Sequence, residues 1–331
     1  MPTKPQVFVS RIIPEVGLAL IKETCDAEVW PDPLPPGPAV LCRKIAHVDG
    51  LVSLLTDKLD AGVLDLAPRL KVISNFAVGF NNIDLEECTR RGIAVGNTPG
   101  VLTDATADMA FCLLIAAARR LVEAHHYTLA GRWKTWEPLG HLGQDLAGRT
   151  LGVVGMGRIG AALARRCRGG WDMKILYYDI HQNAHAEADL GARRVDLPTL
   201  LRESDFVSLH ADLNDATRGM IGAEQFRIMK RSAVLINTAR GPLVDHKALV
   251  DALKGGMIFA AGLDVTDPEP PSLDDPLLQL PNVVVAPHIA SATIETRNRM
   301  AEICARNLIA GVTDRQLPAW VNPEVASKRR K

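Results

Sequence analysis

Net charge, long apolar runs and paired cysteines are all missing from this chain. Its 331 residues include 38 Lys and Arg and 38 Asp and Glu, so the charge balance gives no electrostatic reason to bind nucleic acid or an anionic membrane. The most apolar stretch, Met109–Ala118, is too short to span a bilayer and is flanked by Asp108 and Arg119. The first residues lack the apolar segment of a signal peptide. We therefore expect a soluble, cytoplasmic protein.

Cysteine usage excludes two further classes. The six cysteines form no C-x-x-C pair, and no histidine lies at metal-ligand spacing from them. We therefore expect reduced thiols, with no disulfide framework and no metal site. Cys112 and Cys304 lie in helical apolar patterns and are expected in the core. The basic run Lys328–Lys331 is short, so a frayed, solvated end is expected.

The sequence does contain two sets of alternating strand and helix patterns. In the first set, short strands are predicted at 7–9, 51–52, 72–74 and 93–95, with helices after Pro14, at Ala61–Ala67 and at Leu85–Arg90. Five prolines between Pro31 and Pro38 predict a surface loop. The second set predicts strands at Thr150–Val154, Lys174–Tyr178, Phe206–Leu209, Ala233–Ile236, Phe259–Gly262 and Val283–Ala286, with helices at Arg158–Arg168, Leu197–Glu203, Ala223–Met229 and His246–Lys254. Such alternation predicts an α/β fold with two doubly wound parallel sheets.

A long helix is predicted between the two sets. The segment Gly96–Gly100 breaks the first pattern and indicates a crossing between domains. Asp104 is then expected to cap a helix that runs to about Ala130. The middle of this helix, Ala105–Ala118, is apolar on almost every side, which is typical either of a domain core or of a subunit interface.

A glycine-rich loop points to a ligand. The strand Thr150–Val154 runs directly into Gly155-Met156-Gly157-Arg158-Ile159-Gly160, and a helix follows. The glycines allow a tight turn, a close approach of backbone to pyrophosphate, and close packing of helix on strand. Free N–H groups and the helix dipole favour phosphate there. The glycines alone are a weak signal, but their strand-to-helix setting predicts a dinucleotide site.

Asp179 bears on which dinucleotide is bound. It ends the next strand, 19 residues after Gly160, where the adenosine ribose is expected. A carboxylate accepts hydrogen bonds from the 2′-hydroxyl of NAD and repels the 2′-phosphate of NADP. The following residues, Ile180-His181-Gln182, include no Lys or Arg that would favour NADP. We predict that NAD(H) is preferred and leave NADP(H) open.

Three polar motifs, Asn237–Gly241, Asp264–Pro270 and Pro287–Ser291, follow three later strands, and ligands bind at the carboxyl ends of strands in such sheets. Arg240 has the planar guanidinium fork that can grip a carboxylate and a neighbouring carbonyl. His288 can donate a proton near neutral pH, and Glu269 can orient its ring. Each residue alone is more often a surface or loop residue, but three at successive strand ends predict a catalytic set.

Together these motifs resemble the D-isomer-specific 2-hydroxyacid dehydrogenases over nearly the whole chain. The resemblance looks strongest to glyoxylate and hydroxypyruvate reductases, through Phe76–Asn82, Thr98–Thr103 and Leu263–Thr266. It implies that glyoxylate or hydroxypyruvate is reduced to glycolate or D-glycerate by hydride transfer from NADH, with His288 as proton donor.

The resemblance also implies an organisation of the chain. Residues 1–99 plus 290–331 would form a flavodoxin-like substrate-binding domain, and residues 100–289 a Rossmann dinucleotide-binding domain. The helical region 104–130 would build a homodimer. The only other expected partner is the small 2-oxo or 2-hydroxy acid, with no nucleic acid and no membrane.

Further site residues come from the same resemblance. The amides of Val78 and Gly79 would hold the substrate carboxylate, with Leu55 and Ser291 also at the substrate, and Asp264 would contact the nicotinamide carboxamide. The residues expected around the cofactor are Thr106, Gly155, Gly157, Arg158, Ile159, Gly160, Asp179, His210, Thr217, Thr238, Ala239, Arg240, Asp264 and His288.

Departures from the family pattern leave the substrate open. Ala290 replaces a usual glycine and adds a methyl group near the nicotinamide, and Gly140 lies where some hydroxypyruvate reductases have tryptophan. Glu269 argues against formate dehydrogenases, which carry Gln there, and Val78 argues against phosphite dehydrogenases, which carry Lys. The alternatives that remain are a short phosphoglycerate dehydrogenase, a broad 2-oxo acid reductase, and an NAD-sensing scaffold like the corepressors of the superfamily.

Overall fold

The computed structural model describes residues 4–330, which divide into two compact units. One unit contains the described residues up to Leu102 together with those from Thr293 onward, and the other is Thr103–Ala292. The first unit is therefore assembled from both ends of the chain. No helix in residues 4–330 is both long and apolar enough to cross a membrane.

The first unit is built on a five-stranded sheet in the order β2-β1-β3-β4-β5, with every neighbouring pair parallel. This is the flavodoxin-like order that the resemblance implies. Its strands are β1 (Gln6–Val9), β2 (Asp26–Val29), β3 (Gly50–Ser53), β4 (Val72–Asn75) and β5 (Ala94–Gly96). Its helices are α1 (Glu15–Thr24), α2 (Pro38–Ile45), α3 (Ala61–Asp65), α4 (Leu85–Arg90), α12 (Ile294–Val312) and the 3₁₀ helix η3 (Pro323–Lys328).

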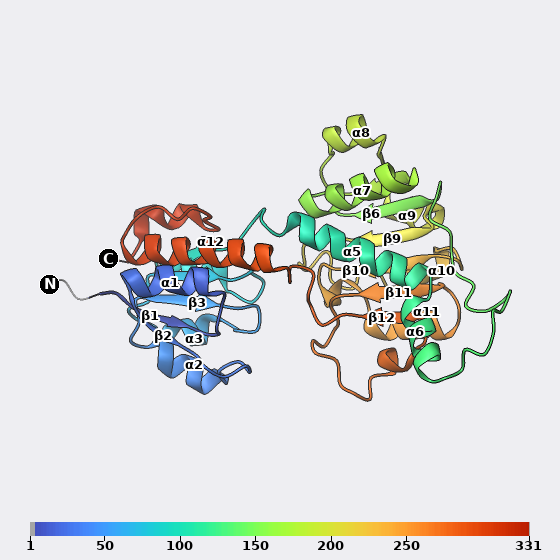
Figure 1. Ribbon diagram of the computed structural model, residues 1–331. Coiled ribbons are helices and arrows are strands. Elements are labelled where there is room, and N and C mark those ends of the chain that lie inside the picture. Colours follow the sequence, from blue (N-terminus) through green and yellow to red (C-terminus); the bar gives the residue numbers. More distant parts are fainter. Residues whose placement is uncertain (1–3, 331) are drawn as a thin grey trace. The chain divides into compact units, whose positions relative to one another are not determined.

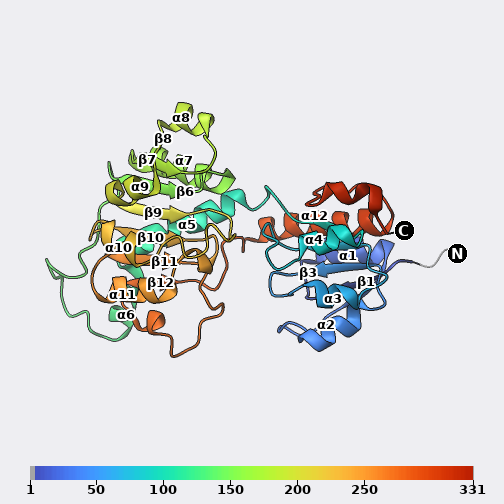
Figure 2. The ribbon, with the colours of Figure 1, turned by 180° about the vertical axis from the view of Figure 1, so that it is seen from behind.

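Helices α1 and α12 lie side by side on one face of this sheet, and α2 and α3 lie on the other (Figures 1 and 2). The α1–α12 contact is a backbone-to-backbone approach, because a Cβ at Gly17 would lie 2.7 Å from the carbonyl oxygen of Ala301. The C-terminal helix is thus a core element of the unit formed by the N-terminal strands.

Several features of the first unit differ from the sequence prediction. Strand β2, in which charged and apolar residues alternate, and helix α2 were not predicted. The proline-rich loop ends at Gly37 because Pro38 opens α2. The prediction of a frayed C-terminus is wrong for the part that is described. Arg330 donates from Nη1 to the carbonyls of Ala67 (2.8 Å) and Leu70 (3.1 Å), which ties the segment after η3 to the loop before β4.

The second unit has a seven-stranded parallel sheet in the order β12-β11-β10-β9-β6-β7-β8. The strand order reverses between β6 and β9, as in a Rossmann dinucleotide-binding fold. Its strands are β6 (Thr150–Val154), β7 (Lys174–Tyr178), β8 (Arg193–Arg194), β9 (Phe206–Leu209), β10 (Val234–Asn237), β11 (Ala260–Leu263) and β12 (Val283–Val285). Its helices are α5 (Thr103–Ala118), α6 (Leu121–Leu129), α7 (Arg158–Trp171), α8 (Ala184–Leu190), α9 (Leu197–Glu203), α10 (Ala223–Ile228), α11 (His246–Lys254), η1 (Gly241–Leu243) and η2 (Pro276–Gln279).

Helices cover both faces of this sheet, and each face has its own apolar core. Along β10, Val234 and Ile236 join the core that α5 and α7 cover, while Leu235 joins the core that α9, α10 and α11 cover. Strand side chains alternate between faces, so a strand buried on both sides is apolar throughout. The carboxyl ends of these strands carry the predicted site.

The predicted long helix is wrong in two respects. It is two helices, because Arg120 adopts a left-handed conformation (φ 51°) between α5 and α6 and its guanidinium pairs with Glu123 at 2.7 Å. Asp104 is not its cap, since α5 begins at Thr103 and Asp104 pairs with Arg166 instead. Cys112 is exposed rather than in the core, whereas Cys304 is buried as predicted.

Candidate active site

The glycine loop has the backbone features that a dinucleotide requires. Gly155 has φ 94°, and a Cβ at Gly160 would lie 2.2 Å from the carbonyl oxygen of Gly155, so helix α7 packs directly on the turn. Gly157 caps α7 and faces open space, with nothing within 4 Å of a Cβ placed there. The first N–H groups of a helix lack partners within it, so this open end can hold phosphate.

Asp179 is tied to the glycine loop. Its Oδ2 accepts a hydrogen bond from the N–H of Met156 at 2.8 Å, and its Oδ1 accepts one from the N–H of His181 at 2.9 Å. Asn183, which sequence reasoning missed, donates from Nδ2 to the carbonyl of Met156 at 2.8 Å and caps α8. Met156 is thereby held at both its N–H and its carbonyl, so the loop and the acid form one preorganised element.

Other predicted cofactor residues differ in how they are placed. Burial lowers the pKa of His210 to about 4, so its ring, bonded to the Ser208 hydroxyl at 2.9 Å, is neutral at neutral pH. The Thr238 hydroxyl is buried without a partner in the described chain, which a bound ligand would supply. Thr217 instead donates to the carbonyl of Asp212 at 2.7 Å within its own loop. Thr106 is buried in α5.

Arg240 follows β10 in a turn that Asn237 spans. The Asn237 side chain accepts from the N–H of Ala239 at 3.0 Å and donates to the carbonyl of Arg240 at 2.9 Å. Burial lowers the pKa of Arg240, and the nearby carboxylates of Glu269 and Asp212 raise it in part. Guanidinium stays protonated in proteins, so the site keeps a half-buried cation after β10.

The turn at Arg240 lies directly against the loop that carries Glu269. A Cβ at Gly241 would lie 1.9 Å from the carbonyl oxygen of Thr266, a distance that no side chain allows. The glycine of this motif therefore has a packing role, which is to bring the turn after β10 and the loop after β11 into contact.

His288 is held from two sides. Its Nδ1 lies 2.5 Å from Oε1 of Glu269, and because a carboxylate only accepts, Nδ1 carries the proton of that bond. Its backbone is left-handed (φ 53°), and its N–H donates to the carbonyl of Asp264 at 2.9 Å. This arrangement leaves Nε2 without a bonded partner in residues 4–330 and available to a reacting group.

Asp264 fixes the segment after His288. Its Oδ1 accepts from the N–H of Ile289 at 2.7 Å and its Oδ2 from the N–H of Ala290 at 2.8 Å. Burial raises the pKa of Asp264, although these two bonds oppose the change. Asp264, which the resemblance assigned to the cofactor, thus also positions the His288 loop.

The predicted substrate residues of the first unit lie in loops after its strands. Asn75 donates to the carbonyl of Gly79 and Asn97 to that of Val78, both at 2.8 Å. These two asparagines were missed because nothing in the sequence distinguishes them from ordinary loop residues. They set the direction of the Val78 and Gly79 peptides.

Leu55 belongs to a loop held by a buried acid. Asp57 accepts from the hydroxyl of Ser10 and from the N–H of Leu54, the latter at 2.8 Å. Burial raises the pKa of Asp57, and these hydrogen bonds oppose that change. The loop therefore has a defined conformation before any ligand binds.

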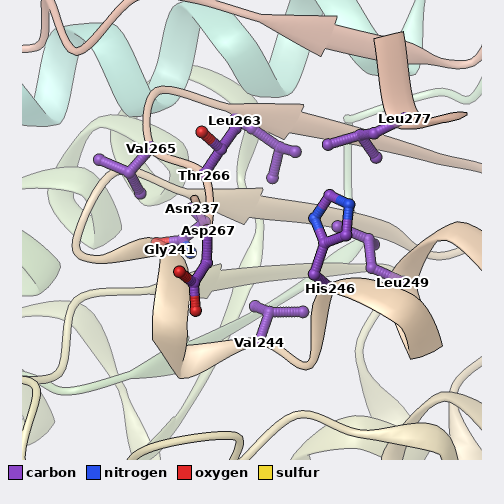
Figure 3. A pocket seen from close by; sticks show the side chains of 10 residues that line it. All are labelled: Asn237, Gly241, Val244, His246, Leu249, Leu263, Val265, Thr266, Asp267 and Leu277. Carbon is purple, nitrogen blue, oxygen red and sulfur yellow. The ribbon is translucent and has the colours of Figure 1, made fainter. Parts of the chain in front are cut away.

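A separate small pocket lies behind the catalytic loops. Its lining includes Gly241, Thr266 and Asp267, with the His246 ring at its side and aliphatic side chains around it (Figure 3). His246 Nε2 pairs with Asp275 at 3.1 Å. None of Arg240, Glu269 and His288 lines this pocket, so it is a packing gap beside the site.

A Rossmann-order sheet with this glycine loop and an Arg–Glu–His set at its carboxyl edge defines the class of dinucleotide-dependent dehydrogenases. Residues 111–290 match the family model described as D-isomer specific 2-hydroxyacid dehydrogenase, NAD binding domain. The chain is 55% identical over 327 residues to a glyoxylate reductase of Korarchaeum cryptofilum, covering 98% of each chain. This protein therefore belongs to the D-isomer specific 2-hydroxyacid dehydrogenase family.

Solved structures agree with this assignment. The TT0316 protein of Thermus thermophilus has a TM-score of 0.89 and 44% identity, covering 96% of this chain and 99% of that one. An NADPH-dependent glyoxylate/hydroxypyruvate reductase of Sinorhizobium meliloti, solved with NADP and malonate, has a TM-score of 0.85 and 31% identity, covering 99% of each chain.

Proposed function

We propose that this protein reduces glyoxylate, with hydroxypyruvate as a further substrate, to the corresponding 2-hydroxy acid. The observation that carries the proposal is the 2.5 Å pair of His288 and Glu269 in the same unit as a half-buried Arg240. Relatives with about half of their residues identical over the whole chain are glyoxylate reductases, which supports this substrate.

In this proposal each residue of the set has one role. Arg240 binds the substrate carboxylate and carbonyl, and the Val78 and Gly79 amides hold the carboxylate from the first unit. A nicotinamide cofactor, when bound, would supply the hydride. His288 donates a proton from Nε2 to the oxygen that becomes the hydroxyl, while Glu269 stabilises the charged imidazole ring and holds its orientation. Ser291 and Leu55 complete the substrate surroundings.

In the same proposal, the cofactor binds to the Thr103–Ala292 unit. The open N-terminus of α7 and the unpartnered Thr238 hydroxyl fit a dinucleotide. We propose NADH as the preferred cofactor because Asp179 presents a carboxylate where the ribose 2′-hydroxyl is expected. Arg158 and Ile159, at the start of α7, would contact the cofactor there.

We also propose a homodimer through the region of α5 and α6. Several large apolar side chains from α6 and the loop after it are exposed, which a single chain in water does not favour. They are Leu121, Leu129, Trp133, Trp136, Leu139 and Leu142. The six unpaired cysteines support a reducing compartment such as the cytoplasm.

Initial rates test the proposal directly. We expect the highest kcat/KM with NADH and glyoxylate or hydroxypyruvate, and lower values with pyruvate and 3-phosphohydroxypyruvate. A preference for 3-phosphohydroxypyruvate would identify a phosphoglycerate dehydrogenase instead. Failure to oxidise NADH with any of the four acids, together with NADH-dependent dimerisation, would identify a scaffold.

A further inference from the structure

Arg194 is an arginine that the sequence places far from Asp179 and the structure places beside it. It lies in β8, at the edge of the sheet, and its neighbour across the ladder is Tyr177. Its guanidinium reaches along β7 and donates from Nε and Nη2 to the carbonyl oxygen of Asp179, at 3.1 and 2.7 Å. Nη2 also donates to the carbonyl of Ile180 at 2.9 Å. A cation is therefore anchored at the carboxyl end of β7.

These hydrogen bonds do not neutralise the positive charge of Arg194. Its acceptors are neutral carbonyls, it forms no ion pair within residues 4–330, and its Nη1 has no hydrogen-bond partner there. The nearby carboxylate of Glu187 is already engaged by the Tyr177 hydroxyl and by Gln182, both at 2.6 Å. Arg194 is exposed and presents two free N–H groups to solvent.

The Asp179 carboxylate beside Arg194 is held by the backbone. Each of its oxygens accepts one backbone N–H, and these two hydrogen bonds stabilise its negative charge. A hydroxyl arriving at this edge meets an acceptor, whereas a phosphate monoester meets an acceptor that repels it and an anchored cation that attracts it. Guanidinium binds phosphate oxygens with strong, charge-assisted hydrogen bonds.

We infer that Arg194 forms a subsite for the 2′-phosphate of NADPH, which lets this protein use NADPH as a second cofactor despite Asp179. The inference rests on the proposed cofactor site and adds a specificity-determining residue to it. Because Arg194 is held by backbone carbonyls rather than by an acid, no ion pair has to break before the phosphate binds. NADH remains the preferred cofactor, and Arg194 reduces the ratio of kcat/KM with NADH to kcat/KM with NADPH.

Calorimetric binding of two fragments isolates the 2′-phosphate without turnover. The probes are 2′,5′-ADP, which carries that phosphate, and 5′-AMP, which lacks it. We expect Arg194→Gln to weaken 2′,5′-ADP binding about 5–20-fold and 5′-AMP binding less than about twofold, as loss of one charge-assisted phosphate contact at an exposed site predicts. The loss for 2′,5′-ADP should shrink at high salt.

Arg193→Gln is the matched control. Arg193 is the adjacent residue of β8, where successive side chains point to opposite faces, and it pairs with Glu203 at 2.7 Å. This variant removes the same net charge from the opposite face of the strand. It should therefore leave the ratio of the 2′,5′-ADP and 5′-AMP affinities unchanged. Equal losses in both variants would show a long-range charge effect and overturn the inference.

Steady-state rates extend the test and separate it from the broader proposal. We expect kcat/KM with NADPH to fall about 5–20-fold in Arg194→Gln while the value with NADH changes little. If 5′-AMP and NADH bind normally but Arg194→Gln affects neither 2′,5′-ADP nor NADPH, the inference is wrong and the proposed function stands. If the protein binds neither fragment nor NADH, the proposed cofactor site itself is wrong.

Discussion

At the residue scale, the second unit holds two histidine–carboxylate pairs that differ in what surrounds them. His288 pairs with Glu269 beside Arg240, whereas His246 pairs with Asp275 at the side of the small pocket in Figure 3. In both pairs a histidine ring nitrogen lies within hydrogen-bond distance of a carboxylate oxygen, so such a pair alone does not identify a catalytic site. The accompanying cation and the position after β12 distinguish His288.

This contrast gives a matched prediction. His288→Gln should lower kcat with glyoxylate by about 10²–10⁴-fold, because the proton donor is lost. His246→Gln should keep kcat within about twofold of the wild-type value, since His246 pairs with Asp275 and not with Glu269 and has no place in the proposed proton transfer. Initial rates with saturating NADH measure both, and equal losses in the two variants would remove His288 from the proposed mechanism.

Gly241 supports a second prediction at this scale. Gly241→Ala places a methyl carbon against the carbonyl of Thr266, so the Arg240 turn must move away from the Glu269 loop. We expect the free energy of unfolding to fall by about 1–3 kcal/mol and kcat/KM to fall with it.

Gly169→Ala is the control for Gly241→Ala. Gly169 lies in α7 with open space around its Cβ position, so alanine should stabilise the helix by up to about 1 kcal/mol. Denaturant unfolding measures both variants. A Gly241→Ala protein as stable and active as the wild type would contradict the packing role.

His210 makes stability depend on pH. Burial lowers its pKa to about 4 from 6.5, so the unfolded chain binds more protons than the folded one between these values. The part of the free energy of unfolding that depends on the neutral His210 ring is complete above pH 6.5 and is lost as the pH falls toward 4. We expect the free energy of unfolding to drop from pH 7 to pH 5 by about 1–2 kcal/mol more in the wild type than in His210→Gln. Equal drops in the two proteins would show that the buried ring is not the cause.

At the scale of elements, apolar strands were predicted well and polar ones were not. Thr150–Val154, Lys174–Tyr178 and Phe206–Leu209 agree with the structure to the residue, because buried parallel strands are uninterrupted apolar runs. Strand β8 consists of two exposed arginines and has no such signal. The sequence did not predict the break between α5 and α6 at Arg120, because no glycine or proline lies there.

Helix α8 matters because its cap also holds the glycine loop. Asn183→Ala should lower the free energy of unfolding by about 1 kcal/mol, because the α8 cap is lost. It should also weaken NADH binding severalfold, since the carbonyl of Met156 is released.

Asn183→Ser separates these two effects. Serine still caps a helix, so stability should stay within about 0.5 kcal/mol of the wild-type value, but its short side chain cannot reach Met156. NADH titration by fluorescence and urea unfolding provide the two readouts. Normal NADH affinity in Asn183→Ser would show that the Met156 contact is dispensable.

At the scale of the whole molecule, the motifs predicted the family and the general order of both sheets. The roles of the individual site residues stay predictions, because they depend on bound ligands. Asn75, Asn97 and Arg194 were missed, since a contact between loops distant in sequence leaves no local pattern. The sequence therefore predicted which side chains could act in a site, but not the hydrogen bonds that hold them in position.

The exposed apolar segment after α6 gives a prediction about assembly. Light scattering should report a particle of about twice the 35.9 kDa chain mass, because large apolar side chains gain from being buried between subunits. Trp136→Glu should shift the protein toward a monomer. Leu34→Glu, at another highly exposed apolar residue in the proline-rich loop, should not. A monomeric wild type would rule out the proposed homodimer.

The pairing of α1 with α12 has a consequence for synthesis on the ribosome. Roughly 270 residues separate the two helices, so at about 5–20 residues per second α1 waits on the order of 15–50 s for its partner. The Thr103–Ala292 unit is complete before α12 emerges, and it can fold while the first-made strands still expose an uncovered face. The strands β1–β5 are therefore made before the Thr103–Ala292 unit but reach their native state after it, and a ribosome that stalls before residue 294 would leave that unit finished and the other one unfinished.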